Sequence, residues 1–77
     1  MSMREELLEI LEDIRPDTDF EGEEALIDDN ILESLDIVAL VGELNDAFDI
    51  EITVDELIPD NFNSVDRLLD MIERLQD

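Results

Sequence analysis

The 77-residue sequence contains no cysteine, histidine, lysine, tyrosine or tryptophan, and its four basic residues are all arginines. Without cysteine the chain can form neither a disulfide framework nor a thiolate metal site. Without histidine, lysine or tyrosine it lacks the side chains that usually activate a serine nucleophile or transfer protons. The sequence places no acidic residue in an apolar pocket, where burial would raise the pKa of a carboxyl group. We therefore predict that the protein is not an enzyme.

Negative charge dominates what is present, because 25 acidic residues face only four basic ones and the formal net charge is −21. Such a charge repels nucleic acid and anionic membranes, and it attracts proteins that carry basic patches. No apolar run approaches the roughly 20 residues that a membrane span needs, and the acidic N-terminal segment does not resemble a signal peptide. We expect a cytoplasmic monomer that neither binds nucleic acid nor inserts into a membrane.

The apolar residues recur at helical spacing, which favours a folded protein over a disordered acidic chain. Hydrophobic residues make up 44% of the sequence, but only three of them are aromatic, all phenylalanine. A capping box at Ser2 and Glu5 predicts the start of a first helix, which Pro16 ends. A second helix is predicted from Ser34 to Phe48, with Ser34 as its N-cap.

Two more helices are predicted in the C-terminal third of the chain. Thr53 and Glu56 form a second capping box, which opens a short helix that Pro59 closes. Asn63 or Ser64 then caps the last helix. We therefore expect an all-α fold, a small four-helix bundle with three longer helices and one short one, in a single domain over 1–77. The side chains predicted to form the core are Met3, Leu7, Ile10, Leu11 and Ile14, then Ile37, Leu40, Val41, Leu44 and Phe48, and finally Val65, Leu68, Leu69, Ile72 and Leu75.

The long connection over 16–33 mixes apolar and acidic side chains. It includes Phe20, Leu26, Ile27 and Leu32, which are too apolar to be all exposed. A compact domain rarely keeps so long a loop unless the loop packs or has a function. We therefore expect this connection to lie against the helices.

The same connection contains the outline of a calcium-binding loop. Asp17, Asp19, Glu21, Gly22 and Asp28 fall at the first, third, fifth, sixth and twelfth positions of an EF-hand loop. The last position is an aspartate instead of the bidentate glutamate, and the preceding helix ends at the proline just before the loop. One possible function is therefore that of an acidic interaction module or a calcium-binding module, in either case without a prosthetic group.

Ser34 allows two interpretations. As a helix cap it would have only a structural role, since serine is among the most frequent N-cap residues. A helix N-terminus also favours a phosphate group, so a phosphodiester on Ser34 would be stabilised there. Leu35, Val38, Ala39 and Gly42 face away from the predicted core, and a mid-helix glycine costs about 1 kcal/mol relative to alanine. A partner could lie against this surface while another enzyme modifies the serine.

The segment Ile31-Leu32-Glu33-Ser34-Leu35-Asp36 resembles the Asp-Ser-Leu motif of acyl carrier proteins and related thiolation domains. In that family the serine carries 4′-phosphopantetheine, whose thiol holds an acyl or aminoacyl thioester. The resemblance covers nearly the whole chain, because 48–52 looks like the family's segment after its second helix and 63–65 like the start of its last helix. It implies a carrier protein with a covalent cofactor taken from coenzyme A.

The resemblance also implies a role for individual residues. Ser34 is the expected attachment site, and Glu33 stands where the family usually has aspartate. The implied partners are a phosphopantetheinyl transferase, an acyl- or aminoacyl-loading ligase, and downstream acyl-transfer enzymes with basic docking patches. The residues expected to dock them are Glu33, Leu35, Asp36, Val38, Ala39, Gly42, Glu43 and Asp46.

Several positions depart from the fatty-acid carriers. Those carriers usually have glutamates where this chain has Ala39, Asn45 and Ala47, and a methionine where it has Gly42. The run Ala25–Asp28 looks more like free-standing carriers that resemble D-alanyl or peptidyl carriers. A housekeeping fatty-acid role is therefore not favoured, and the choice between acyl and aminoacyl cargo stays open.

Overall fold

The computed structural model describes residues 2–16, 18–29 and 31–76, and all of their regular structure is helical. Within these residues the longer helices α1 (Met3–Ile14), α2 (Ser34–Phe48) and α4 (Val65–Gln76) are joined by the short α3 (Pro59–Phe62) and by two 3₁₀ turns, η1 (Phe20–Gly22) and η2 (Val54–Glu56). The predicted small helical bundle, with three longer helices and one short one, is confirmed.

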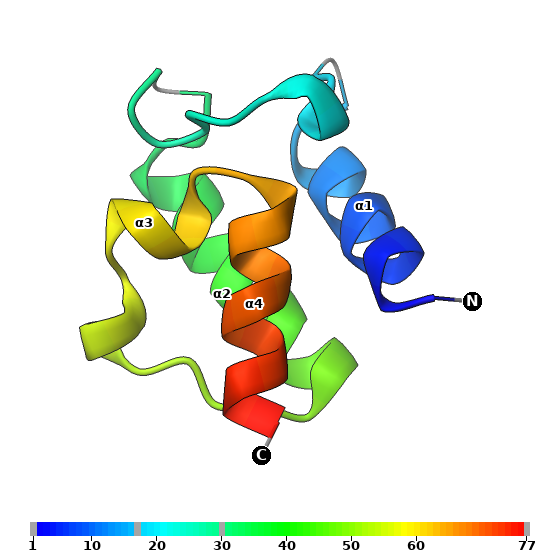
Figure 1. Cartoon of the computed structure of the whole chain (residues 1–77), viewed down its shortest axis with the longest axis vertical. Coiled ribbons are helices and arrows are strands. Elements are labelled where there is room, and N and C mark those ends of the chain that lie inside the picture. Colours follow the sequence, from blue (N-terminus) through cyan, green and yellow to red (C-terminus); the bar gives the residue numbers. More distant parts are fainter. Residues whose placement is uncertain (1, 17, 30, 77) are drawn as a thin grey trace.

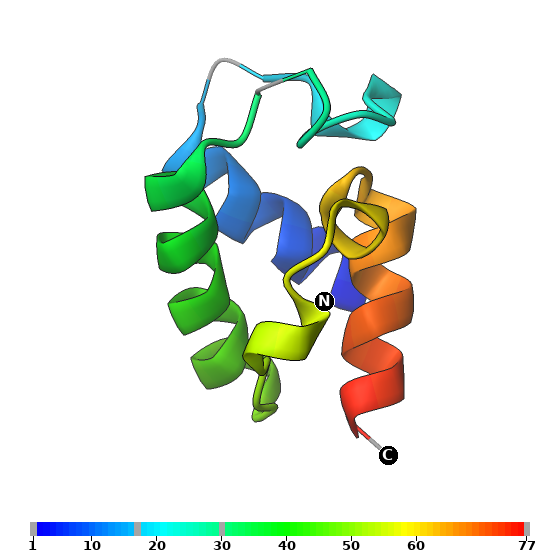
Figure 2. The same cartoon turned by 90° about the vertical axis from the view of Figure 1, so that its left-hand side faces the viewer.

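α1 lies between α2 and α4 and connects them. It packs against both α2 and α4, while α3 packs against α4 (Figure 1). α1 runs upward in that view, whereas α2 and α4 both run downward. Figure 2 shows α2 and α4 on opposite sides, with α1 crossing from one to the other. The connection after α1 covers one end of the bundle, the end at which α2 begins.

The core is built from side chains of every α-helix, from three side chains of the connection between α1 and α2, and from Ile50 and Ile52 after α2. As expected, Phe20, Leu26 and Leu32 of that connection are buried. Met71 is also buried, although it was not predicted. Six residues of the predicted core are only partly buried: Met3, Ile14, Ile37, Val41, Leu69 and Leu75. The buried side chains are Leu7, Ile10, Leu11, Phe20, Leu26, Leu32, Leu40, Leu44, Phe48, Ile50, Ile52, Phe62, Val65, Leu68, Met71 and Ile72.

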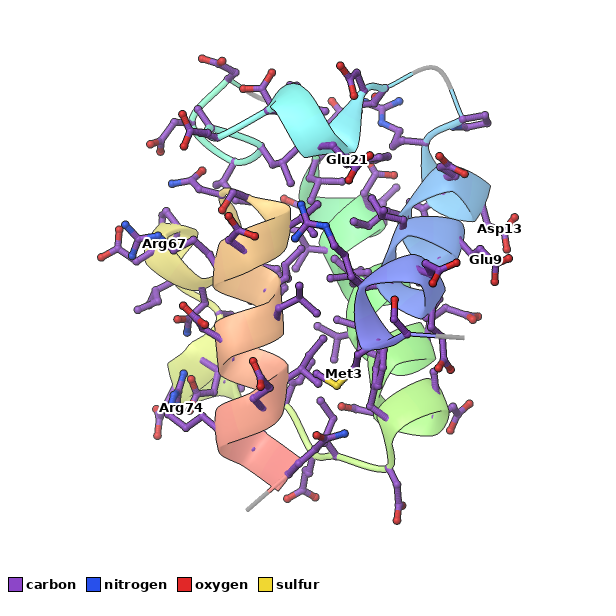
Figure 3. The ribbon with its side chains drawn as sticks, turned by 45° about the vertical axis from the view of Figure 1, so that its right-hand side comes forward. Met3, Glu9, Asp13, Glu21, Arg67 and Arg74 are labelled. Carbon is purple, nitrogen blue, oxygen red and sulfur yellow. The ribbon has the colours of Figure 1, made fainter. Side chains whose placement is uncertain are left out.

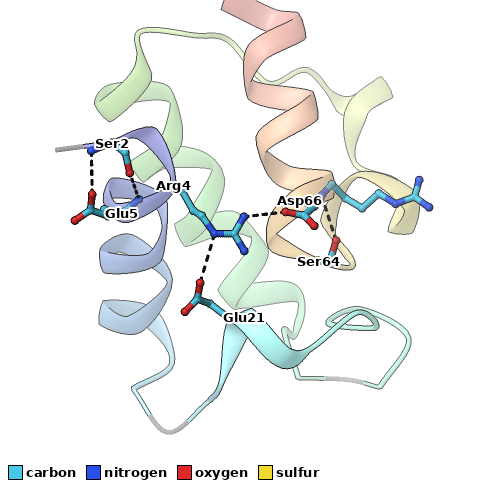
Figure 4. A network of polar contacts seen from close by, with 7 residues as sticks. Ser2, Arg4, Glu5, Glu21, Ser64 and Asp66 are labelled. Carbon is cyan, nitrogen blue, oxygen red and sulfur yellow. Dashed lines mark hydrogen bonds and ion pairs between the residues drawn. The ribbon is translucent and has the colours of Figure 1, made fainter.

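Serine side chains cap two helices. Ser2 Oγ accepts a hydrogen bond from the Glu5 N–H at 3.2 Å, and Glu5 Oε1 accepts one from the Ser2 N–H at 3.3 Å (Figure 4). This capping box was predicted. Ser64, one of the two predicted caps of α4, accepts a hydrogen bond from the Arg67 N–H at 3.1 Å. Asn63 has another role: its Oδ1 accepts hydrogen bonds from the N–H groups of Ile27 and Asp28, at 3.0 and 3.2 Å.

The predicted range of α2, Ser34–Phe48, is confirmed, but two predicted caps and one predicted role of a proline are wrong. Glu33, with extended backbone angles, is the N-cap of α2, and Ser34 is its first helical residue. Thr53 makes no side-chain capping hydrogen bond, and the residues after it form only the 3₁₀ turn η2 instead of the predicted short helix. Pro59 does not close a helix but opens α3. A proline is well suited to the first helical position, because its fixed φ matches the helix and its missing N–H needs no partner there.

Arginines join acidic segments that are far apart in the sequence. Arg4 lies between Glu21 of η1 and Asp66 of α4, at 3.4 and 2.8 Å (Figure 4). Arg74, labelled in Figure 3, reaches both carboxylate oxygens of Glu56 at 2.9 Å. The hydrogen bonds from Arg74 lower the pKa of the Glu56 carboxyl group. In a chain with this excess of acids, each such arginine offsets repulsion at a point where two segments meet.

Candidate functional site

Ser34 lies at the start of α2, where its side chain is exposed to solvent. The helical hydrogen bonds begin beside it, since the Ile37 N–H donates to the Glu33 carbonyl at 2.9 Å. The first N–H groups of a helix have no partner within the helix, and they lie at the positive end of its dipole. An anionic group attached to Ser34 would therefore meet a favourable electrostatic environment.

Arg15, the residue that follows α1, contacts the chain on both sides of Ser34. Its Nε donates to the Ile31 carbonyl at 3.0 Å and lies 3.1 Å from Asp36 Oδ2, and its Nη2 lies 3.5 Å from Glu33 Oε2. The same Asp36 oxygen accepts a hydrogen bond from the Glu33 N–H at 3.1 Å. Sequence reasoning missed Arg15. The available signal was its rarity, since only four bases serve 25 acids.

The outer side of α2 is apolar and open near Ser34. The Leu35 side chain is 84% exposed and that of Val38 is 69% exposed. Ala39 and Gly42 are also exposed, and a Cβ atom built on Gly42 meets nothing within 4 Å. No contact within the described residues therefore accounts for this mid-helix glycine.

The acids predicted for docking differ in their surroundings. Glu43 and Asp46 are exposed on α2, and Glu33 is exposed at its start. The Asp36 side chain is only 20% exposed and is held between Arg15 and the Glu33 N–H. A partner that reaches Asp36 would have to share it with Arg15, whereas Glu43 and Asp46 lie open to solvent.

An apolar cavity of about 190 Å³ lies beside the first turns of α2. Ile37, which lies almost one helical turn after Ser34, forms part of its wall. Leu57 and Ile58 are partly exposed at the cavity. The remaining lining comes from Ile27, Pro59 and Phe62.

The acidic side chains of the calcium-loop pattern do not gather around one point in the part of the chain that is described. Glu21 pairs with Arg4, and Asp28 Oδ2 accepts a hydrogen bond from Asn63 Nδ2 at 3.2 Å. No three acidic side chains in 2–16, 18–29 and 31–76 are grouped so that they could hold a metal ion. Asp17, the first position of the pattern, lies outside the described residues.

The glycine of that pattern has a local structural reason. A Cβ atom at Gly22 would lie 2.9 Å from Asp19 Oδ2. Such a contact is closer than side chains tolerate, so any larger residue would displace the Asp19 carboxylate or the turn. The placement of this glycine therefore does not require a calcium loop.

Comparison with known proteins agrees with this geometry. Residues 2–72 match the family described as phosphopantetheine attachment site. The chain belongs to this family. It is 30% identical to the D-alanyl carrier protein of Streptococcus sanguinis (strain SK36) over 77 residues, which cover 99% of this chain and 98% of that protein. It is 31% identical, with the same coverage, to the D-alanyl carrier protein of Streptococcus pyogenes serotype M5 (strain Manfredo). No solved structure gives a significant match.

Members of this carrier family hold 4′-phosphopantetheine covalently and are not catalytic, so both predictions hold for this carrier. The residues around Ser34 fit such a group. The helix N-terminus favours its phosphodiester, and the two acids that would repel it, Glu33 and Asp36, are both paired with Arg15. None of the helices in the described part of this carrier is long and apolar enough to cross a membrane.

Proposed function

We propose that Ser34 is the residue to which 4′-phosphopantetheine is attached, and that the chain 1–77 acts as one carrier domain. The observation that carries this proposal is a comparison of the three serines of the chain. Ser2 and Ser64 accept hydrogen bonds from the first turns of α1 and α4, so both hydroxyls cap a helix. Ser34 is the exposed first residue of α2, beside the ion pair between Arg15 and Asp36.

A partner enzyme must perform the attachment, because the sequence has no histidine, lysine or cysteine to activate the serine. Ser34 Oγ loses its proton and bonds to the phosphorus next to pantetheine in coenzyme A. The pyrophosphate bond breaks and adenosine bisphosphate leaves. Once bound, the group supplies a terminal thiol that holds the cargo as a thioester. The chain contributes the attachment point, the favourable helix end and the surface that partners recognise.

The proposed docking surface is the outer side of α2, with Leu35 and Val38 as its apolar part and Glu43 and Asp46 as its exposed acids. The proposed partners are a phosphopantetheinyl transferase, a loading ligase and acyl-transfer enzymes with basic patches. Acids at a binding surface mainly speed association and set orientation. Transient binding of this kind suits a cytoplasmic monomer that visits several enzymes in turn.

We further propose a small aminoacyl cargo such as D-alanine. The relatives described above are named D-alanyl carrier proteins. The apolar cavity beside α2 measures about 190 Å³, whereas pockets that enclose drug-sized ligands typically measure about 300–1,000 Å³. A cargo that remains outside the bundle is compatible with so small a cavity.

The attachment site is tested by intact mass after incubation with coenzyme A and a broad-specificity transferase. The wild-type chain should gain one phosphopantetheine group, and Ser34→Ala should gain none while remaining folded. Ser64→Ala is the matched control, because it also removes a serine hydroxyl from a helix start and should still be modified. Modification of Ser34→Ala, or loss of modification in Ser64→Ala with its fold intact, would contradict the assignment.

The cargo proposal is tested with chains that carry either a D-alanyl or an octanoyl group on the arm. If the cargo stays outside the bundle, the NMR signals of Ile37 and Phe62 should be the same in both forms. Shifts confined to these cavity residues in the octanoyl form would show that the chain encloses an acyl tail. That result would favour a fatty-acyl cargo and would leave the attachment site unchanged.

A further inference from the structure

Arg15 is placed to hold together the short segment that presents Ser34. Its guanidinium contacts Ile31, Glu33 and Asp36, three residues of the six-residue segment 31–36 that contains the serine. Its own N–H donates to the Leu11 carbonyl at 2.8 Å, which ties its backbone to the last turn of α1. The contacts therefore fix the serine-bearing turn relative to a helix, not merely relative to its neighbours in the sequence.

The contact with the backbone distinguishes Arg15 from the other bridging arginines. Arg4 joins carboxylates of η1 and α4, and Arg74 of α4 binds the carboxylate of Glu56 in η2, both away from Ser34. Ion pairs between exposed groups contribute little, because water and salt screen them. The Ile31 carbonyl is partly buried, and a charged donor that satisfies such a carbonyl contributes more than an exposed ion pair does. Arg15 therefore acts on the path of the main chain as well as on its charge.

We propose that Arg15 is a positioning residue for the modification of Ser34. It holds residues 31–36 in the conformation in which Glu33 caps α2 and Ser34 Oγ is presented to a transferase. This inference rests on the proposed attachment at Ser34. The guanidinium also offsets the charges of Glu33 and Asp36, which lie beside the position of the incoming phosphodiester.

The expected consequence follows from preorganisation. Without Arg15 the turn populates several conformations. A transferase that recognises only the conformation held by Arg15 then binds more weakly, in proportion to the reduced population of that conformation. A reacting group displaced by about 1 Å can lose about a hundredfold in rate, so a loosened but intact turn should lose about tenfold. The loss should come from the turn and not from the fold as a whole.

The test measures kcat/KM for transfer from coenzyme A to full-length Arg15→Gln, Arg15→Lys and Arg74→Gln. Arg74→Gln is the matched control, since it removes the same charge and another bridge between elements, yet lies away from Ser34. Arg15→Lys retains the charge but lacks the planar fork that can serve a carbonyl and two carboxylates at once. Amide hydrogen exchange provides the second readout, because a loss of global stability would not be confined to residues 32–36.

We expect Arg15→Gln to fall about tenfold, Arg15→Lys to remain below the wild type, and Arg74→Gln to match it. Amide exchange should accelerate in residues 32–36 of the Arg15 variants while α4 keeps its protection. Wild-type kcat/KM in Arg15→Gln, full recovery in Arg15→Lys, or an equal loss in Arg74→Gln would overturn the proposal. A faster Arg15→Gln would overturn it too, since Arg15 would then compete with the partner. In each of these cases the proposed attachment at Ser34 would still stand, provided that the wild-type chain is modified at that residue.

Discussion

Both the inner and the outer side of α2 carry large apolar side chains, but only those on the inner side are covered. Leu40 and Leu44 are fully buried on the inner side, whereas Leu35 is 84% exposed and Val38 is 69% exposed on the outer side. A helix that is apolar around most of its circumference is normally buried on all sides. Here the inner side stabilises the fold, and the outer side is left open beside the proposed attachment serine. This difference supports the proposal that partner proteins bind the outer side.

The largest expected effect is on the inner side. Leu44→Ala removes a fully buried side chain and should reduce the free energy of unfolding by about 2–5 kcal/mol. A domain of this size has roughly 4–11 kcal/mol in total, so the variant should be close to unfolding. Urea unfolding followed by circular dichroism measures the loss. A change below about 0.5 kcal/mol, the size typical of surface substitutions, would show that the inner side is not the stabilising one.

On the outer side the effect should appear in binding and not in stability. Leu35→Ala combined with Val38→Ala should lower kcat/KM for modification about tenfold, equivalent to about 1.4 kcal/mol. Val54→Ala is the control, because Val54 is 82% exposed and lies in η2, outside α2. A loss in the control equal to that in the α2 variant would remove the distinction between the outer side and the rest of the apolar surface.

Gly42 lies on the outer side and should respond in opposite directions in the two assays. Gly42→Ala should raise the free energy of unfolding by about 1 kcal/mol, because alanine is a better helix former and no described atom lies near its Cβ position. If a partner approaches the backbone closely there, modification should become slower while stability rises. Urea unfolding together with the transferase assay separates the two effects. Faster modification of the stabilised variant would show that partners need no close approach at this position.

The smallest effect is expected away from both sides of α2, at the pair between Glu56 and Arg74. The pair lowers the pKa of Glu56 in the folded state, so it stabilises the fold at pH values above the ordinary carboxyl value of 4.5. That contribution is lost as the pH falls through the lowered folded-state pKa. Glu56→Gln should therefore be less stable than Glu51→Gln at neutral pH, and the two should converge in acid.

Glu51 is the matched control for that comparison. It is exposed in the connection before η2, so its substitution removes the same charge without removing the bridge to Arg74. Urea midpoints measured for both variants across the acid range give the difference directly. A constant difference between the two variants at every pH would mean that the ion pair contributes nothing.

Most of the fold could be predicted, because apolar periodicity and the Ser2–Glu5 capping box are local signals. The errors arose where local signals conflict. Ser34 and Glu33 can each precede a helix, and the boundary at Glu33 agrees with the contact between its N–H and Asp36, whose carboxylate Arg15 also holds. Pro59 can end one helix or begin the next, and the sequence carries both possibilities equally.

The sequence was sufficient to propose Ser34 as the candidate site, but it did not predict which side chains surround this serine. The motif around Ser34 and the apolar outer side of α2 are visible in a short stretch of sequence. Arg15 is separated from Asp36 by 21 positions, and nothing local indicates which of 25 acids an arginine will meet. The cavity next to Ile37 could not be predicted for the same reason, since its walls come from three separate segments.

The sequence alone determined that the chain is helical, strongly acidic and without histidine, lysine, cysteine or tyrosine, because these properties depend on composition and on spacings of three or four residues. Only the tertiary structure decided which arginine meets which acids, and that Asn63 holds the connection at Ile27 and Asp28. These contacts form between segments that packing brings together, and their distances cannot be read from the order of residues along the chain.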